Sequence, residues 1–192
     1  MSTLLKYHGH NLDEAMIFGI AHALTFVWMP LIKLNGMPLV SYRTAPRSII
    51  KNTCKALGLK LSVRKFSDAQ SGQAALDAAL SSGKLAGLQT SVFWLPYFPP
   101  QMRFHFNAHN LLVYGKDGND YLISDPVFET VQRCAAEDLQ RARFAKGVLA
   151  AKGMMYTLKD NRPSEKIMAD LPATIRKAIR KNAKHMLAPV FF

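Results

Sequence analysis

One stretch, Phe104–Pro126, constrains the fold of this chain more than any other, because its pattern predicts a β-hairpin. Apolar and polar residues alternate on both sides of a Lys-Asp-Gly sequence, which is typical of two antiparallel strands joined by a turn in which glycine has a positive φ. The alternating apolar residues are Leu111, Val113, Tyr121 and Ile123. The chain is therefore expected to contain an antiparallel sheet.

The predicted hairpin brings two ionisable residues together. A three-residue turn at 116–118 pairs Gly115 with Asn119, and counting outward two residues at a time places His109 opposite Asp125. Directly paired residues have Cβ atoms roughly 4.5–5.5 Å apart. We therefore predict that the imidazole of His109 contacts the carboxylate of Asp125.

A histidine held by a carboxylate forms the base and its orienting group in many nucleophilic sites. The carboxylate fixes the histidine tautomer and favours the charged ring, so that the ring can take up and return a proton. The competing interpretation of His109 is a core or turn histidine satisfied by backbone groups, and the pattern leaves both interpretations open. The missing part of a complete site is a nucleophile.

An aromatic, proline-rich loop at Pro96–Pro100 precedes the hairpin. A rigid loop of this kind is a candidate wall of a substrate cleft. We predict that Pro96, Tyr97 and His105 line this cleft.

The remaining histidines give weaker signals. His8 and His10 flank Gly9 at a helix end, where capping or exposure is favoured over a metal pair. His22 is most simply a core histidine. Phosphate-binding and dinucleotide-binding signatures are absent from the sequence, so we expect neither a metal nor a cofactor.

Outside the hairpin, hydrophobic periodicity and turn residues predict helices and strands in mixed order, which is typical of an α+β fold. We expect Asn11 to cap one helix, either Ser67 or Asp68 to cap another, and Asn35-Gly36 to form a hairpin turn. The predicted helices are 2–8, one after Asn11, 46–57, one that Gly83 ends, and 135–144. The predicted strands are 26–34, 37–43, 59–66, 85–95, 129–133 and 154–158.

Several short motifs occur in the order found in a known family. They are Leu95-Pro96-Tyr97, His109 followed by Leu111–Tyr114 and Gly115, Ser124-Asp125-Pro126, and the early segments Leu4–Gly9 and Phe18-Gly19. Over most of residues 1–158 they resemble the N-terminal domain of the butirosin biosynthesis protein H family.

The resemblance implies a papain-like fold, with a central antiparallel sheet and flanking helices, akin to the bacteriocin-processing cysteine peptidases. The type member of the family is an acyltransferase that moves an acyl group from a carrier-protein thioester to an amine. By this resemblance His109 is the general base and Asp125 orients it.

The sequence departs from the family pattern at the nucleophile. In the family the reactive cysteine lies near the start of the first helix, several residues before the position that aligns with Met1, and no residue of this sequence occupies that place. We therefore expect the N-terminus to be incomplete and the 192-residue chain to be inactive. Thr90-Ser91 also replace an acidic residue that family members commonly carry.

Neither cysteine of the sequence is expected to substitute for the missing thiol. Cys54 falls in mid-helix, whereas a reactive thiol is better placed at a helix N-terminus, where the helix dipole lowers its pKa. Cys134 follows Arg133, which is a better electrostatic setting, but its place after the hairpin fits no known order of this site. Two cysteines alone suit a reducing, cytoplasmic location.

The C-terminal part of the chain is predicted to form a separate, basic segment. We expect the papain-like domain to span 1–158, a linker 159–165, and an amphipathic helical extension 166–192. Apolar residues recur every four positions in the extension, and basic residues fill the rest of the helix surface. Pro172 is expected to kink this helix or to mark its start.

Three hypotheses for function follow. The first is cysteine-dependent acyl transfer or amide hydrolysis in secondary-metabolite or lipid-type biosynthesis, with an acyl carrier protein or a small-molecule acyl acceptor as partner. The second is a non-catalytic module of the same fold that binds an acyl chain or carrier. The third is a protein of the inner membrane face that binds anionic lipid through Arg176, Lys177, Arg180 and Lys181. Nucleic acid is not an expected partner, since no aromatic or glycine-rich motif accompanies the charge.

Overall fold

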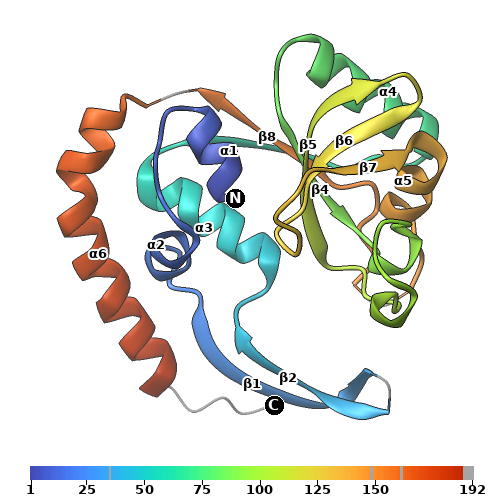
Figure 1. Ribbon diagram of the computed structural model, residues 1–192. Helices are drawn as coiled ribbons and strands as arrows, with labels where there is room; N and C mark the ends of the chain where they lie inside the picture. The colour runs from blue at the N-terminus through green and yellow to red at the C-terminus, as the bar shows by residue number, and fades with distance from the viewer. Residues whose placement is uncertain (35, 148, 161, 188–192) are drawn as a thin grey trace. The chain divides into compact units, whose positions relative to one another are not determined.

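A computed structural model describes residues 1–34, 36–147, 149–160 and 162–187 (Figure 1). The chain divides into two compact units. Unit 1 consists of 61–159 with Met1 and Thr3, and unit 2 consists of Ser2, 4–60 and the segment from Asp160 to the C-terminus. The C-terminal helix therefore groups with the N-terminal segment.

Unit 1 is built around a six-stranded sheet with strand order β3-β8-β4-β5-β6-β7 (Figure 1). The pairs β4–β8, β4–β5, β5–β6 and β6–β7 are antiparallel. The strands are β3 (Lys60–Arg64), β4 (Ala86–Thr90), β5 (His109–Asp117), β6 (Asp120–Ser124), β7 (Gln132–Ala135) and β8 (Met155–Asp160). All five residues of β4 are buried, as expected of a strand near the middle of a sheet with both faces covered.

Two helices pack on this sheet, α4 (Ala69–Ser81) and α5 (Ala136–Arg143), and two short 3₁₀ turns lie at 92–94 and 100–102. Asp68 caps α4 by accepting the backbone N–H of Ser71 at 2.7 Å, which decides between the two predicted caps. The core between helices and sheet is apolar, and its fully buried members include Leu76, Leu88, Leu95, Val113, Tyr121, Ile123 and Leu139.

Arg143, the last residue of α5, has a fully buried side chain that contacts α4. Its Nη1 donates to the carbonyl of Gly72 at 3.0 Å, and burial lowers the pKa of the guanidinium to about 10. A Cβ on Gly72 would lie 2.8 Å from the Phe144 ring, so glycine lets α4 and α5 approach closely.

The β5–β6 hairpin is present, but its turn differs from the prediction. Asp117 pairs with Asp120, so that Gly118-Asn119 is a two-residue turn, and Gly118 has φ +58° as expected. An irregularity between Val113 and Gly115 then shifts the register. The predicted pairing of Gly115 with Asn119 is therefore wrong, because sequence alternation cannot reveal an extra residue at a bulge.

Within its described residues, unit 2 contains four helices and one separate sheet. The helices are α1 (Ser2–Tyr7), α2 (Glu14–Ile20), α3 (Pro46–Leu57) and α6 (Ser164–Leu187). The sheet is a single hairpin, β1 (Leu24–Leu34) with β2 (Met37–Arg43), whose strands are antiparallel as predicted. Asn35 of the predicted turn lies outside the described residues.

Several predicted boundaries of the other elements move. Asp13, and not Asn11, caps α2, since its side chain accepts the N–H of Met16 at 2.7 Å. The predicted strand 85–95 ends at Thr90 and continues as a 3₁₀ turn, and the strand expected at 129–133 lies at Gln132–Ala135. α6 begins at Ser164, so Pro172 lies inside the helix and does not mark its start.

α6 packs along α2, α3 and β1 within unit 2, and its buried residues are Ile167, Leu171 and Ala178. These positions belong to the apolar stripe expected from the sequence, which anchors the helix while its basic side chains stay exposed. Among the residues that the structure describes, no helix is long and apolar enough to cross a bilayer.

Candidate active site

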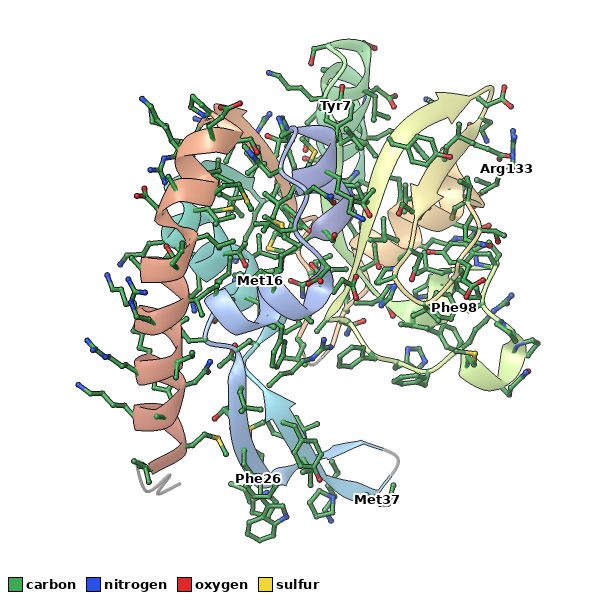
Figure 2. All side chains as sticks on the ribbon, turned by 60° about the vertical axis from the view of Figure 1, so that its left-hand side comes forward. Tyr7, Met16, Phe26, Met37, Phe98 and Arg133 are labelled. Atoms are coloured by element: carbon green, nitrogen blue, oxygen red, sulfur yellow. The ribbon has the colours of Figure 1, made fainter. Side chains whose placement is uncertain are left out.

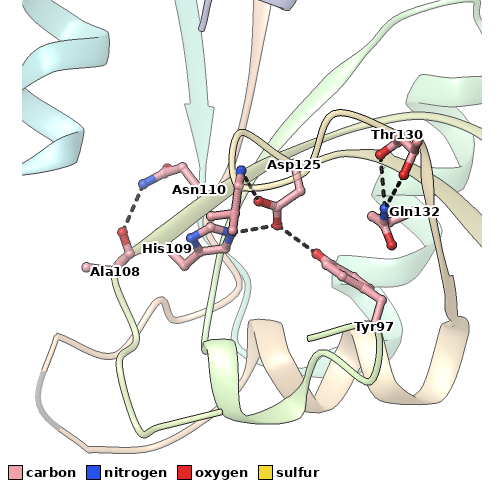
Figure 3. A network of polar contacts seen from close by, with 8 residues as sticks. Tyr97, Ala108, His109, Asn110, Asp125, Thr130 and Gln132 are labelled. Atoms are coloured by element: carbon pink, nitrogen blue, oxygen red, sulfur yellow. Dashed lines mark hydrogen bonds and ion pairs between the residues drawn. The ribbon is translucent and has the colours of Figure 1, made fainter. Parts of the chain in front are cut away.

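His109 and Asp125 are in direct contact, as the sequence predicts. The Nε2 atom of His109 lies 2.6 Å from Oδ2 of Asp125, which is a short hydrogen bond to a carboxylate (Figure 3). The Asp125 side chain is fully buried, and that of His109 is 11% exposed. The pair is therefore largely shielded from water.

The strand register that brings His109 and Asp125 together differs from the predicted register. Leu112 pairs with Ser124, and one further step of this register sets Leu111 opposite Asp125. His109 therefore meets Asp125 as a diagonal neighbour, a distance that a histidine side chain can span. Across the other edge of β5, His109 pairs with Thr90 of β4, which fixes the strand on both sides.

Asp125 is held in place by two further donors. The Tyr97 hydroxyl donates to Oδ2 at 2.9 Å, and the backbone N–H of Val127 donates to Oδ1 at 3.0 Å (Figure 3). Burial, followed by the nearby Asp125 charge, raises the pKa of Tyr97, so its hydroxyl stays protonated and remains a donor. Three hydrogen bonds thus fix the carboxylate that orients His109.

Aromatic rings surround the pair. Phe98 meets the His109 ring edge-to-face with ring centroids 5.5 Å apart, and it also contacts Phe128 at 4.9 Å. Tyr97 contacts Phe128 in turn, with centroids 5.6 Å apart. These rings lower the local dielectric, which strengthens the hydrogen bonds inside them.

A second set of contacts anchors the segment that leads into His109. Buried Gln89 donates to the carbonyls of Asn107 at 2.8 Å and of Leu149 at 3.1 Å. Asn107 donates to the carbonyl of Lys146 at 3.2 Å. These hydrogen bonds fix the start of β5, and with it the backbone of His109.

The geometry assigns the two ring nitrogens of His109 to different tasks. An ionised carboxylate only accepts hydrogen bonds, so Nε2 carries the proton that it shares with Asp125. Nδ1 makes no hydrogen bond to the described residues. In this tautomer Nδ1 holds a lone pair, and it is the atom that can take a proton from a nucleophile.

The other residues predicted for a cleft take different places. Tyr97 belongs to the Asp125 cluster, a role that the sequence did not show because the two residues are 28 positions apart. The exposed Pro96 accepts a hydrogen bond from Nη2 of Arg103. His105 is exposed and stacks on Phe93, with ring centroids 4.0 Å apart. A substrate-contacting role for these three residues stays a prediction.

Thr90 and Ser91, which stand where the resemblance expects an acidic residue, are fully buried. Neither hydroxyl has a hydrogen-bond partner among the described residues. Unpaired buried hydroxyls are rare and costly, of the order of 1–3 kcal/mol each. Thr90 also pairs with His109, so an unsatisfied polar atom lies on the strand beside this histidine.

Both cysteines are buried and unreactive in character. Burial raises the pKa of Cys54, in α3, to about 12, and it raises that of Cys134, in β7, to the same value. A thiol with this pKa is protonated at neutral pH and is a poor nucleophile. Among the described residues, no group of three or more histidine, cysteine or acidic side chains is arranged to hold a metal.

A family model described as butirosin biosynthesis protein H, N-terminal, matches residues 1–126. The chain belongs to this family. The matched range ends just after Asp125, so it includes both members of the pair. A second model, a domain of unknown function (DUF4872), matches residues 137–192, which include α6.

The butirosin H family assignment agrees with the fold. The crystal structure of a C39-like peptidase from Bacillus anthracis superposes with a TM-score of 0.53 and 13% identity, covering 84% of this chain and 86% of that one. The expected papain-like α+β fold is therefore confirmed. No curated protein matches the sequence.

Proposed function

We propose that this chain forms part of a cysteine-dependent acyltransferase, in which His109 is the general base and Asp125 orients it. The observation that carries the proposal is the 2.6 Å contact of His109 Nε2 with a buried, triply hydrogen-bonded carboxylate, which leaves Nδ1 free to accept a proton. The papain-like fold and the family are those of a cysteine enzyme.

The chemistry follows from these groups. Nδ1 takes the proton of a thiol, and the thiolate attacks the carbonyl carbon of a thioester. The carrier leaves as a thiol after His109 returns the proton, and the acyl group remains on the enzyme sulfur. An amine then attacks this acyl-enzyme, His109 accepts the amine proton, and the amide departs as the enzyme thiol re-forms.

We do not expect the nucleophilic thiol among the 192 residues of this sequence. Cys54 and Cys134 are buried, and their raised pKa values disfavour the thiolate that the first step needs. We therefore propose that the 192-residue chain alone does not turn over, and that the nucleophile lies before Met1, as the family resemblance implies.

The donor and acceptor classes also belong to the proposal. A thioester on an acyl carrier protein is the donor that the family resemblance favours, with a small-molecule amine, or water in the hydrolytic variant, as acceptor. Cytoplasmic biosynthesis is the setting in which such carrier thioesters occur.

The decisive experiment compares the printed chain with the same chain extended by the in-frame residues encoded before Met1. Both are incubated with an S-acyl pantetheine thioester and an amine, and the products and any acyl-enzyme are measured by mass spectrometry. We expect turnover and an acyl-enzyme only for the extended chain, and a loss of about 10²- to 10⁴-fold in His109→Ala. Turnover unaffected by His109→Ala contradicts the assignment of the base.

Thiol labelling supplies the control on the resident cysteines. In the printed chain, Cys54 and Cys134 are expected to react with a thiol reagent at pH 8 only when the protein unfolds, since burial keeps both thiols protonated. Rapid labelling of either cysteine in the native state would make that residue a rival nucleophile.

The alternative is a non-catalytic module that binds an acyl chain or carrier. The burial of both cysteine thiols favours this alternative, because the 192-residue chain then has no reactive thiol nucleophile among them. It predicts saturable binding of the acyl pantetheine by the extended chain, with no acyl-enzyme and no product.

A further inference from the structure

The β1–β2 hairpin of unit 2 exposes a row of large apolar side chains. Residues on one face of a strand recur every second position, and the exposed members of this row are Phe26 and Trp28 on β1 with Val40 and Tyr42 on β2. Trp28 pairs with Val40, and the rings of Phe26 and Tyr42 lie 5.7 Å apart, so these side chains form one continuous surface, the hairpin face.

The hairpin face is uncovered in the described part of the chain. In the residues that the structure describes, the sheet has only these two strands, and Trp28 and Tyr42 are 53% and 68% exposed. Near the turn, Leu31 is 96% exposed and Met37 is also exposed. A contiguous apolar surface of this kind marks an interaction site, and a two-stranded ribbon is at best marginally stable alone.

The edges of the hairpin are poor sites for strand addition. Pro30 lies in β1 and Pro38 in β2, and a proline removes the N–H that an added strand would need. Lys33 adds a charge on the same two-stranded sheet, and a charged side chain on an edge strand also disfavours pairing with a further strand. The partner is therefore expected on the face of the hairpin and not along its edge.

The net positive charge of unit 2 indicates which class of partner it can bind. Its sequence contains fourteen lysines and arginines against five acidic residues, so it carries +9 of the +12 total. Five exposed cations follow one another on α6 without forming an ion pair to any described residue: Arg176, Lys177, Arg180, Lys181 and Lys184. With Ala173 they line an open hollow of about 420 Å³. Like-charge repulsion opposes a second copy on this surface and favours an anionic partner.

The cations and the hairpin face are neighbours within unit 2. Nζ of Lys181 lies 3.1 Å from Nε2 of His22, just before β1, and the rings of His22 and His185 are 5.5 Å apart. In both views the C-terminal end of α6 lies beside the base of the hairpin (Figures 1 and 2). Met186 and Leu187 at this end are exposed too, so apolar groups flank the last basic turns.

We propose that unit 2 docks on an anionic lipid bilayer through the hairpin face and the last turns of α6. The aromatic side chains enter the boundary between headgroups and acyl chains, where tryptophan and tyrosine are favoured. Arg180, Lys181 and Lys184 meet the lipid phosphates, because cations near an anionic surface are attracted to it. The aliphatic side chains of Leu31 and Met37 near the turn are exposed beside the aromatic ones, and since bases do not stack on aliphatic groups this favours lipid over nucleic acid. This inference is independent of the proposed acyl transfer.

The chain offers its own reporter for this contact. It has two tryptophans, Trp28 in the hairpin and Trp94 in unit 1, so Trp94→Phe leaves Trp28 as the single tryptophan, which can be excited selectively. On phosphatidylcholine vesicles with about 30% phosphatidylserine, we expect a blue-shifted emission that lipids brominated in their acyl chains quench. Binding should weaken at least about tenfold on pure phosphatidylcholine and in about 0.5 M salt, because the charge attraction is screened.

Two variants and two matched controls locate the surface. Phe26→Ser with Tyr42→Ser, and separately R180E with K181E and K184E, are each expected to weaken vesicle binding about tenfold or more in co-sedimentation. The control for the first is Val131→Ser, an exposed apolar residue of unit 1. The control for the second reverses three exposed lysines of unit 1, namely Lys65, Lys84 and Lys146.

Three results would overturn the proposal: no binding to the anionic vesicles at low salt, equal losses in variants and controls, or tighter binding to a random RNA than to the vesicles. A dimer that Phe26→Ser with Tyr42→Ser disrupts, in the absence of lipid binding, would also overturn it and assign the hairpin face to a second copy. Circular dichroism of each variant verifies that the fold is kept, and the tryptophan reporter remains informative if the serine variant is unstable.

Discussion

The two hairpins of this protein share a sequence pattern and differ in almost everything that surrounds them. β5–β6 lies inside a six-stranded sheet, where Leu111, Val113, Tyr121 and Ile123 are almost completely buried. β1–β2 forms a sheet of its own and exposes its largest side chains. One hairpin therefore positions polar groups with buried supports, whereas the other presents an apolar surface.

The difference shows what alternation along a strand encodes. A period of two fixes which side chains share a face, but it does not say whether that face meets a core, solvent or a partner. In β5–β6, neighbouring strands and helices supply the cover. In β1–β2, Pro30 and Pro38 reduce the capacity of the edges to gain neighbours.

Truncating one apolar residue in each hairpin tests this difference, and it is expected to give the largest effect. Ile123→Ala removes a fully buried side chain and is expected to lower the free energy of unfolding by about 2–5 kcal/mol. Trp28→Ala, although it removes more atoms, is expected to cost less than about 1 kcal/mol, since its side chain is half exposed. Urea denaturation followed by circular dichroism measures both, and similar losses would mean that the hairpin face is covered in solution.

The cluster around Asp125 supplies the second prediction. Asp125→Ala leaves the His109 ring and the Tyr97 hydroxyl without their shared acceptor, and it is expected to cost about 2–3 kcal/mol. Tyr97→Phe removes one of three donors and is expected to cost about 1–2 kcal/mol. Denaturation at pH 7 gives both values.

Phe104→Ala and Val131→Ala are the matched controls for this cluster, because both side chains are exposed residues of unit 1. They should change the stability by less than about 0.5 kcal/mol. If Tyr97→Phe proves as silent as these controls, the hydroxyl does not support the carboxylate, and its position beside Asp125 serves another purpose.

The sequence predicts the contact between His109 and Asp125, but it does not predict the hydrogen bonds that hold Asp125 in place. His109 and Asp125 were expected to meet, and they do, although Gly118-Asn119 forms a shorter turn and a bulge near Tyr114 resets the pairing. The contact survives this error because a histidine can reach diagonally as well as directly across. Local alternation therefore predicts the neighbourhood of a pair better than its register.

Tyr97 shows where such reasoning ends. Its hydroxyl reaches Asp125 only after the loop that follows β4 folds back beside the end of β6, and no local period encodes that approach. The exposure of the hairpin face was missed for the same reason, since the number of strands in a sheet is a property of the whole fold. Some helix ends were predicted more closely, as at Leu57, where the predicted helix 46–57 ends before a left-handed glycine, and at Asp68, because capping depends on adjacent residues.

The smallest expected effect compares the two hairpin turns. Gly118 has φ +58° and Gly36 has φ +82°, and alanine in either place carries a strain of about 1 kcal/mol. In Gly118→Ala the β5–β6 turn cannot open without loss of the core strands, so the full strain should appear as a lower free energy of global unfolding.

In Gly36→Ala the two-stranded β1–β2 sheet can open locally while the rest of unit 2 stays folded. Its cost should therefore appear as faster amide exchange in 24–43, with global stability changed by less than about 0.5 kcal/mol. Equal global losses in the two variants would show that β1–β2 unfolds only together with the core, and the contrast between a hairpin inside a large sheet and a two-stranded one would then be lost.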